Sequence, residues 1–404
     1  MNSLGFGRYA FSICVSVAMF TGCSSGSGTS LSPSPAGLSA ERARPSVTYG
    51  VLYSFKGGSG DGADPYAGVI SVNGTLYGTT YSGGASGDGT VFAVTKTGKE
   101  TVLYSFKGGS SDGTQVVGGL LNVKGMLYGT TRSGGANGGG TVFSITPSGT
   151  ETVLHSFGAS GDGAGPAAGL INVRGTLCGT TAYGGANGDG TVFSITPSGT
   201  ETVLYSFKGG SEDGAYPEAG LINVKGTLYG TTVNGGANSG SGDGDGTVFK
   251  ITRSGTESVL HSFGGSGDGK LPYAGVISVK DRLYGTTLEG GANNDGAAFK
   301  IARSGKETVL HSFGGSGDGV NPLAGVISVK NTLYGTTYSG GANNLGTVFS
   351  ITPSGAETVL YSFKGGSEDG NYPYAALINV MGTLYGTTYS GGANASGTVF
   401  TLTR

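Results

Sequence analysis

The sequence has no Trp and only three Cys, and charged residues make up 12% of its 404 residues. So few cysteines exclude a disulfide framework. A net charge of −2 argues against the broad basic surface of a general nucleic-acid binder. The apolar run "YAFSICVSVAMF" near the N-terminus is too short to span a bilayer as a mature helix, and it is typical of a targeting segment.

The first 22 residues are predicted to be a lipoprotein signal peptide. Arg8 precedes the apolar run, which ends in "FTGC" and resembles a bacterial lipobox, although Phe20 stands where Leu is usual. In such proteins the Cys, here Cys23, carries the lipid after cleavage; a plain secretory signal is the alternative. Ser24 resembles the outer-membrane sorting pattern, so the expected location is the bacterial cell envelope. Residues 23–46 have the composition of a flexible tether.

The rest of the chain repeats one phrase. "GTLYGTT" at 74–80 has near-copies down the chain, each followed by a "GTVF"-like segment and a "LYSF"-like segment. The Phe residues of the "SF" dipeptide recur at a spacing close to 50 residues, at Phe55, Phe106, Phe157, Phe207, Phe263, Phe313 and Phe363. Gly is abundant, with 85 residues, but it alternates with apolar β-formers, so a buried core remains possible. A period of this length that contains only strand signals predicts propeller blades.

One unit predicts four short strands, at 219–224, 227–232, 247–252 and 257–263. The "PSG" between the last two strands suits a tight turn. Gly within "LYGTT" has no side chain, so a neighbouring blade is expected to approach closely there. Cys178 replaces the Tyr of this phrase and is expected to be a core thiol. The predicted fold is all-β, a seven-bladed propeller of four-stranded blades over 47–404.

The two ends of the repeat region are complementary. "TYGVLYSF" at 48–55 reads as a fourth strand without the preceding three, and "GTVFTLTR" at the C-terminus reads as a third strand without a fourth. Together they make one blade, which predicts that the ring closes by pairing the N-terminal strand with the last blade. Closure would remove the exposed sheet edges.

The "LYGTT…GG…GTVF" unit resembles GloVer, a bacterial tandem repeat of the choice-of-anchor group of surface proteins. The resemblance covers essentially all of the chain after the tether. It implies a secreted β-propeller that is held to a cell envelope, with Cys23 as the anchor here. It brings no catalytic residues to this sequence.

The long loops hold every Asp except Asp281 and are expected to form one acidic face, whereas the short turns, with more Lys and Arg than acids, form the other. A ligand or calcium site near the channel mouth is one interpretation, because calcium takes several oxygen ligands. The alternative is that Asp and Gly only form turns. The candidate aspartates are Asp61, Asp64, Asp112, Asp162, Asp213, Asp268, Asp318 and Asp369.

Tyrosines in the same loops are candidates for ligand contact, above all Tyr66, Tyr273 and Tyr374. Their rings could stack on sugars or anchor a protein partner. The absence of Trp weakens the sugar interpretation. The alternative is that these rings pack between adjacent blades.

Features of an enzyme are few. His155, His261 and His311 replace Tyr in the fourth strand of three different blades, so they are not expected to converge on one metal ion or one nucleophile. No Ser/His/Asp grouping, phosphate loop or zinc-type Cys pair is present. A carbohydrate-active hydrolase that uses a carboxylate pair among the loops remains the alternative.

The sequence therefore predicts a monomeric, envelope-anchored, non-enzymatic binding propeller whose acidic loop face takes a protein or a glycan. It predicts no nucleic-acid partner and no catalytic residues. The clearest break in the repeat is the insertion at 238–246, with Asp243 and Asp245.

Overall fold

The computed structural model describes residues 47–238, 244–252 and 254–404, and every regular element in this part of the chain is a β-strand. The predicted signal peptide, the tether, Cys23 and Asp243 lie outside the described residues. Within the described ranges no helix is long and apolar enough to cross a bilayer.

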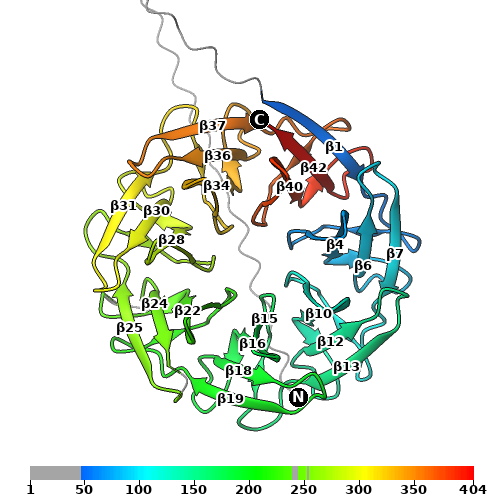
Figure 1. Ribbon diagram of the computed structural model, residues 1–404, viewed down its shortest axis with the longest axis horizontal. Helices are drawn as coiled ribbons and strands as arrows, with labels where there is room; N and C mark the ends of the chain where they lie inside the picture. Colours follow the sequence, from blue (N-terminus) through cyan, green and yellow to red (C-terminus); the bar gives the residue numbers. More distant parts are fainter. Residues whose placement is uncertain (1–46, 239–243, 253) are drawn as a thin grey trace, which may run out of the picture. The chain divides into compact units, whose positions relative to one another are not determined.

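Seven four-stranded antiparallel sheets stand around one axis, which confirms the predicted seven-bladed propeller (Figure 1). Blade 1 runs outward from β3 (Ile70–Val72) through β4 (Thr75–Thr80) and β6 (Thr90–Val94) to β7 (Glu100–Ser105).

Blades 2 to 7 repeat this order. The innermost strands are β9 (Leu121–Val123), β15 (Ile171–Val173), β21 (Ile222–Val224), β27 (Ile277–Val279), β33 (Ile327–Val329) and β39 (Ile378–Val380). The second strands are β10 (Met126–Thr131), β16 (Thr176–Thr181), β22 (Thr227–Thr232), β28 (Arg282–Thr287), β34 (Thr332–Thr337) and β40 (Thr383–Thr388). The third strands are β12 (Thr141–Ile145), β18 (Thr191–Ile195), β24 (Thr247–Ile251), β30 (Ala297–Ile301), β36 (Thr347–Ile351) and β42 (Thr398–Thr403). The outer strands are β13 (Glu151–Ser156), β19 (Glu201–Ser206), β25 (Glu257–Ser262), β31 (Glu307–Ser312), β37 (Glu357–Ser362) and β1 (Thr48–Ser54).

A pair of two-residue strands accompanies each blade, in segments that the sequence predicted only as loops. In blade 1, Gly62–Ala63 (β2) pairs with Ser82–Gly83 (β5). The other pairs are β8 (Gly113–Thr114) with β11 (Ser133–Gly134), β14 (Gly163–Ala164) with β17 (Tyr183–Gly184), β20 (Gly214–Ala215) with β23 (Asn234–Gly235), β26 (Gly269–Lys270) with β29 (Glu289–Gly290), β32 (Gly319–Val320) with β35 (Ser339–Gly340), and β38 (Gly370–Asn371) with β41 (Ser390–Gly391). These short pairs join, by backbone hydrogen bonds, the loop that enters each blade from the preceding one and the loop between its second and third strands.

The two ends of the propeller pair as predicted. Strand β1 lies antiparallel to β42 from Thr48 opposite Thr403 to Ser54 opposite Thr398, so it forms the outer strand of blade 7. In addition, the Thr387 hydroxyl donates to the Ala67 carbonyl oxygen at 3.0 Å, which links blade 7 to blade 1. The ring is therefore closed by backbone and side-chain hydrogen bonds.

The glycine of the repeated phrase makes room for an aromatic ring. Gly78 on β4 lies opposite Phe92 on β6, and a Cβ atom at Gly78 would lie 2.5 Å from Cζ of that ring. The expectation that a neighbouring blade approaches this glycine is wrong, because the ring belongs to the same blade.

The two threonines that follow Gly78 have separate roles. The Thr79 hydroxyl donates to the Gly118 carbonyl of blade 2, and the Thr80 hydroxyl bonds to that of Thr90 within blade 1.

The core lies between the blades. Phe55 at the end of the outer strand of blade 7 meets Phe92 of blade 1 edge-to-face, with ring centroids 4.9 Å apart, and both rings are fully buried. The same contact recurs at the other six junctions at 4.9–5.3 Å. Cys178 is buried in one of these junctions, which confirms the predicted core thiol.

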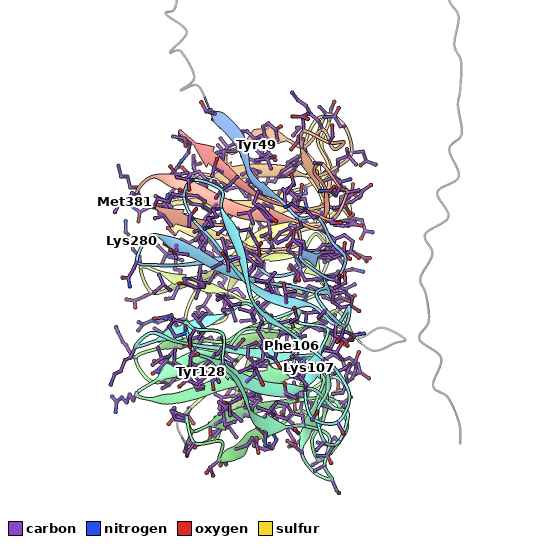
Figure 2. The ribbon with its side chains drawn as sticks, turned by 90° about the vertical axis from the view of Figure 1, so that its right-hand side faces the viewer. Tyr49, Phe106, Lys107, Tyr128, Lys280 and Met381 are labelled. Carbon is purple, nitrogen blue, oxygen red and sulfur yellow. The ribbon has the colours of Figure 1, made fainter. Side chains whose placement is uncertain are left out.

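Each outer strand contains a β-bulge. In blade 1, Val102 pairs with Phe92 and Tyr104 with Val91, so Leu103 has no partner in the ladder. A bulge increases the local twist of a strand. The turns between the first and second strands lie on one face of the ring, where Lys280 and Met381 project, and Lys107 belongs to a long loop nearer the other face (Figure 2).

The closure makes a prediction for truncated proteins. Deletion of residues 1–56 removes β1 and Phe55, so β42 loses its outer partner and the blade 7–blade 1 junction loses a buried ring. We expect this protein to aggregate or to lose most of its thermal stability. A protein that lacks only residues 1–45 is the control and should melt like the full chain. Equal melting of the two truncated proteins would contradict closure.

A second prediction concerns Gly78, which lies under the Phe92 ring. Gly78→Ala should lower the free energy of unfolding by about 1–3 kcal/mol, because the new methyl group forces the Phe92 ring to move. Gly60→Ala is the control, since nothing lies within 4 Å of its Cβ position, and it should change the free energy by less than about 0.5 kcal/mol. Urea denaturation of both variants measures the difference, and equal effects would exclude the steric explanation.

Candidate functional site

Most of the candidate aspartates hold the long loops in shape. The Asp61 side chain is 4% exposed and accepts three hydrogen bonds, from the Tyr53 hydroxyl at 2.6 Å and from the backbone N–H groups of Lys56 and Gly62 at 2.8 and 2.6 Å. Asp112, Asp213 and Asp369 each accept three equivalent hydrogen bonds in their own junction, from a Tyr hydroxyl and from the backbone N–H groups of a Lys and a Gly. With their oxygens occupied in this way, these carboxylates fit the turn-forming interpretation, and the geometry gives a calcium site at these four positions no support.

The predicted location of these aspartates is wrong for seven of the eight. They bond to a Tyr or His side chain on an outer strand, so they lie at the outer part of the ring and not at the channel mouth. The seven are Asp61, Asp112, Asp162, Asp213, Asp268, Asp318 and Asp369. Asp64 differs: its carboxylate accepts from the Ser82 hydroxyl, and it faces Tyr389 of blade 7.

A glutamate from the next blade completes each of six junctions. Glu100 begins β7 beside a short turn, and the sequence placed it on the face opposite Asp61. The two carboxyl groups in fact lie close enough to interact. The six glutamates share a buried Oε1 atom that has no hydrogen-bond partner: Glu100, Glu151, Glu201, Glu257, Glu307 and Glu357. Burial, and next the Asp61 carboxylate, raises the pKa of Glu100 from 4.5 to about 7, and Lys56 opposes that rise.

The junction between blades 6 and 7 has a different residue at this place. Tyr49 of β1 stands where the other junctions have Glu, and its ring stacks on Tyr361 with centroids 4.0 Å apart and planes 6° from parallel. Burial and the nearby Asp369 raise the pKa of Tyr49, so its hydroxyl stays protonated. A neutral O–H group therefore suits the position beside the aspartate.

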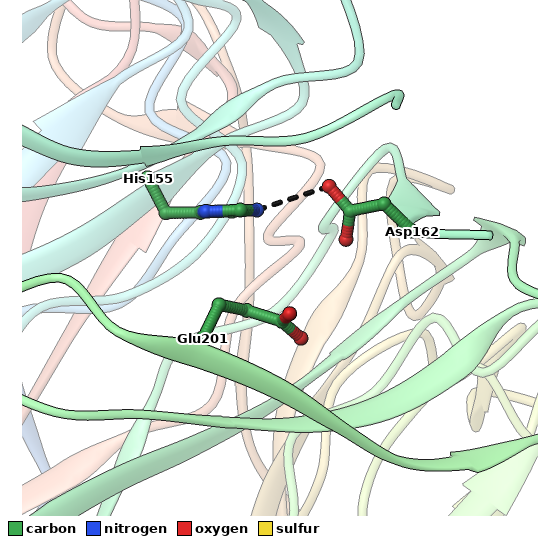
Figure 3. Close-up of side chains that lie close together, drawn as sticks. All are labelled: His155, Asp162 and Glu201. Atoms are coloured by element: carbon green, nitrogen blue, oxygen red, sulfur yellow. Dashed lines mark hydrogen bonds and ion pairs between the residues drawn. The ribbon is translucent and has the colours of Figure 1, made fainter. Parts of the chain in front are cut away.

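Three junctions contain His in place of Tyr. His155 Nε2 lies 3.0 Å from Asp162 Oδ2, and the corresponding distances for His261–Asp268 and His311–Asp318 are both 2.8 Å. As predicted, the three histidines do not converge, because each belongs to a different junction. Two of them nevertheless gather with an Asp and a Glu: His155, Asp162 and Glu201 form one triad, and His311, Asp318 and Glu357 form the other (Figure 3).

Tyrosines of three consecutive blades form a second group, on the loop face. This tyrosine cluster consists of Tyr66, Tyr81, Tyr338, Tyr372, Tyr374 and Tyr389. Tyr66 of blade 1 and Tyr374 of blade 7 are at its centre, with ring centroids 4.5 Å apart. Burial raises the pKa of both hydroxyls, so both remain donors at neutral pH. The structure therefore brings two of the three predicted tyrosines together.

An arginine lies across the mouth from this cluster. Arg132 of blade 2 donates to both carboxylate oxygens of Glu218 in blade 4, at 2.8 and 3.0 Å, and to the Tyr183 hydroxyl at 3.3 Å. Tyr183, Tyr216, Glu218 and Tyr273 also line a shallow pocket. We name these five residues the arginine cluster. A bond between blades 2 and 4 passes over blade 3, which is possible only where the blades converge near the axis.

A family model described as the Gloeobacter/Verrucomicrobia repeat matches residues 21–243 and 237–404. The chain belongs to this family. The match confirms the resemblance seen in the repeated phrase. No curated protein matches the chain.

Solved structures similar to this Gloeobacter/Verrucomicrobia repeat protein include two lyases. One described as streptogramin B lyase is 15% identical, with a TM-score of 0.58, and the match covers 88% of this chain and 97% of that chain. A virginiamycin B lyase from Staphylococcus aureus is 14% identical, with a TM-score of 0.55, and the match covers 89% and 99%. At such low identity, the similarity shows a common fold.

Arg132 and Glu218 were missed by the sequence analysis, although the repeat itself contains the signal. The residue after "GTT" is Tyr81 in blade 1 and Arg132 in blade 2, and the residue before "AG" is Tyr66 in blade 1 and Glu218 in blade 4. The insertion at 238–246 looked like the clearest break in the repeat, but the Asp245 side chain forms an ion pair with Lys270 at 3.8 Å and its carbonyl accepts from the Leu271 N–H. Comparison of the repeats position by position would have found both residues.

The glutamate pKa values predict how stability depends on pH. The pKa of Glu100, Glu151 and Glu257 rises from 4.5 to about 7 in the folded protein, so the fold binds protons more tightly than the unfolded chain. Their contribution to stability is complete below the unfolded value and is lost as the pH rises through about 7. The melting temperature should therefore fall between about pH 5 and pH 8.

Replacement of these three glutamates by Gln should flatten that fall, because Gln does not titrate. Glu212→Gln with Glu368→Gln is the control, since both side chains are exposed. Scanning calorimetry across the pH range measures both proteins. If the triple variant kept the full pH dependence, the glutamates would not be its source.

Proposed function

We propose that this protein is a binding propeller and that the mouth of its loop face binds a glycan. One observation carries the proposal: the repeats agree at the positions that build the blades and differ at the positions that converge on the mouth. The residue before "AG" or its equivalent is Tyr66, Val117, Ala167, Glu218, Tyr273, Leu323 and Tyr374 in blades 1 to 7. The paired Thr residues of "GTT" are the same in all seven.

The chemistry of the mouth suits a sugar. Tyr rings offer apolar faces and hydroxyl groups on one side chain, and they lose little conformational entropy on binding. The Arg132–Glu218 pair is held in a bidentate arrangement, with side-chain exposures of 28% and 17%, so it offers fixed polar groups without a free charge. Tyr183 and Tyr273 of the arginine cluster are the two most exposed tyrosines among the described residues, at 44% and 38%.

Hydrolysis of a glycan is the second function that the sequence left open. It needs two free carboxyl groups at a suitable separation. At the mouth, Glu218 is bound by Arg132, and the Asp–Glu pairs of the junctions lie at the outer part of the ring. These contacts favour binding without hydrolysis.

The proposed place of action is the bacterial cell envelope. The support is the sequence "FTGC" with Cys23 as the lipid-bearing residue, followed by a tether that would hold the propeller away from the membrane surface. The propeller itself acts as a monomer in this proposal, because the ring has no unpaired blade edge at its closing junction.

The test is a glycan array followed by titration calorimetry with the best ligand. Tyr66→Ala combined with Tyr374→Ala should weaken that binding by at least about tenfold, which corresponds to 1.4 kcal/mol. Met381→Ala is the control, because this side chain is 94% exposed on the opposite face, and it should bind like the wild type. Released sugar products in the same mixture would show hydrolysis.

Two results would contradict the proposal. The double tyrosine variant could bind the glycan as tightly as the control does. Alternatively, the array could show no ligand while a protein partner from envelope extracts competes with the tyrosine cluster.

A further inference from the structure

The three histidine junctions differ from the four tyrosine junctions in two linked ways. In the four tyrosine junctions the sequence is "LYSFKGGS", with Lys after Phe. In the three histidine junctions it is "LHSFG", without this Lys. The Asp therefore follows the Phe by five residues in the histidine junctions and by six in the tyrosine junctions. The shorter loop removes a positive side chain. It also removes a hydrogen bond. Asp61 Oδ2 accepts from both the Tyr53 hydroxyl and the Lys56 N–H, whereas among the described residues Asp162 Oδ2 bonds to the His155 ring alone.

The histidine junctions therefore have more free electron pairs and less positive charge. A hydroxyl that only donates to the aspartate is replaced by an imidazole nitrogen that can accept or bind a metal ion. Two carboxyl groups, Asp162 and Glu201, lie close to this nitrogen, and Gly158 stands where the tyrosine junctions have Lys. The change is the kind that a bound cation would compensate.

The geometry fits metal ligation. In each triad the imidazole nitrogen and one oxygen of each carboxylate all lie within 4.8 Å of one another. The distances His155 Nε2–Asp162 Oδ2, 3.0 Å, and His311 Nε2–Asp318 Oδ2, 2.8 Å, are hydrogen-bond distances. Two ligands about 2.1 Å from a tetrahedral ion lie about 3.4 Å apart, so an ion needs only a small separation of these side chains.

The glutamate supplies a second observation, which all six junction glutamates share but which, among the described residues, only these two triads combine with an imidazole nitrogen within 4.8 Å. Glu201 Oε1 and Glu357 Oε1 are buried and have no hydrogen-bond partner, and Figure 3 shows the Glu201 carboxylate directed toward His155 and Asp162. A buried oxygen without a partner costs free energy unless a proton or a cation satisfies it. The His155 and Asp162 side chains keep 23% and 10% exposure, so an ion can enter from solvent.

We propose that the two triads, His155–Asp162–Glu201 and His311–Asp318–Glu357, each bind one divalent transition-metal ion of the Zn²⁺ class. One imidazole and two carboxylates supply three ligands, and water supplies the rest. Binding releases to solvent the proton shared by the His Nε2 and the Asp Oδ2, and it replaces their hydrogen bond by two bonds to the metal. The third histidine junction, His261–Asp268, does not form a triad of this size with Glu307, so it is the internal comparison.

The experiment is calorimetric titration of the metal-free full chain with Zn²⁺, repeated with Co²⁺ to record its visible absorption. We expect two equivalents for the wild type, one for His155→Tyr and none for the double variant His155→Tyr/His311→Tyr. Tyr is the residue of four other junctions, so these variants are expected to fold, and a thermal melt checks this. His261→Tyr is the matched control and should keep both equivalents.

The variant Glu201→Gln tests the His155 site by a second measurement, its affinity for Zn²⁺. It removes the charge with little change of shape and should weaken that site at least tenfold while the His311 site is unchanged. The proposal is overturned if the double histidine variant binds as many ions as the wild type, or if the wild type binds none at tenfold metal excess. A third equivalent that disappears in His261→Tyr would overturn the restriction to two sites.

Discussion

The edge-to-face contact between two buried phenylalanines holds each blade against the next, and the rest of the propeller depends on it. The contact needs space within the blade, which Gly78 provides by having no side chain beneath Phe92. It needs a fixed distance between blades, which the Thr79 hydroxyl provides by its bond to the next blade. Such aromatic pairs add about 0.5–1.5 kcal/mol beyond the area that they bury. Seven identical contacts explain why the phrase is repeated seven times.

This arrangement separates the residues that build the ring from those free to differ. At the junctions, Gly, Thr and Phe recur because any change would alter the spacing between blades. At the mouth no such requirement acts. Tyr66 and Glu218 occupy the same repeat position in blades 1 and 4, and Tyr81 and Arg132 occupy another in blades 1 and 2. The outer part of each junction is intermediate: Asp is constant there, but its partner is Tyr or His and the residue from the next blade is Glu or Tyr.

The architecture was predictable because its signal is local and repeated. The period, the four strands of a blade and the complementary ends all follow from patterns within 50 residues. The two-residue strands were not predicted, since "GA" at 62–63 has no apolar alternation and is defined only by its partner. The sequence placed Asp61 and Glu100 on opposite faces, which holds only if each blade is flat. The two carboxyl groups are in fact close together. Real blades twist, and the bulge at Leu103 adds to that twist, so the start of one outer strand meets the loop after the previous one. Arg132 and Glu218 are 86 residues apart, and only the closed ring brings them together.

Blade 7 shows how the ring compensates for the additional entropic cost of joining the distant ends of the chain. Thr401 on β42 bonds to the carbonyl of Gly50, a separation of 351 residues, and the entropy lost in closing a loop grows with its length. Six of the seven junctions carry a glutamate at the outer position, including the junction of blade 7 with blade 1, where Glu100 lies near Asp61. The seventh, between blades 6 and 7, is lined by β1. Here Tyr49 replaces that glutamate, stacks on Tyr361 and contacts Phe363 and Phe400. A titrating carboxyl group is thereby replaced by a partly buried aromatic ring, which makes apolar contacts at every pH. The strand that closes the ring thus brings an aromatic partner to the blade 6–blade 7 junction, and this contact does not depend on the protonation of a glutamate.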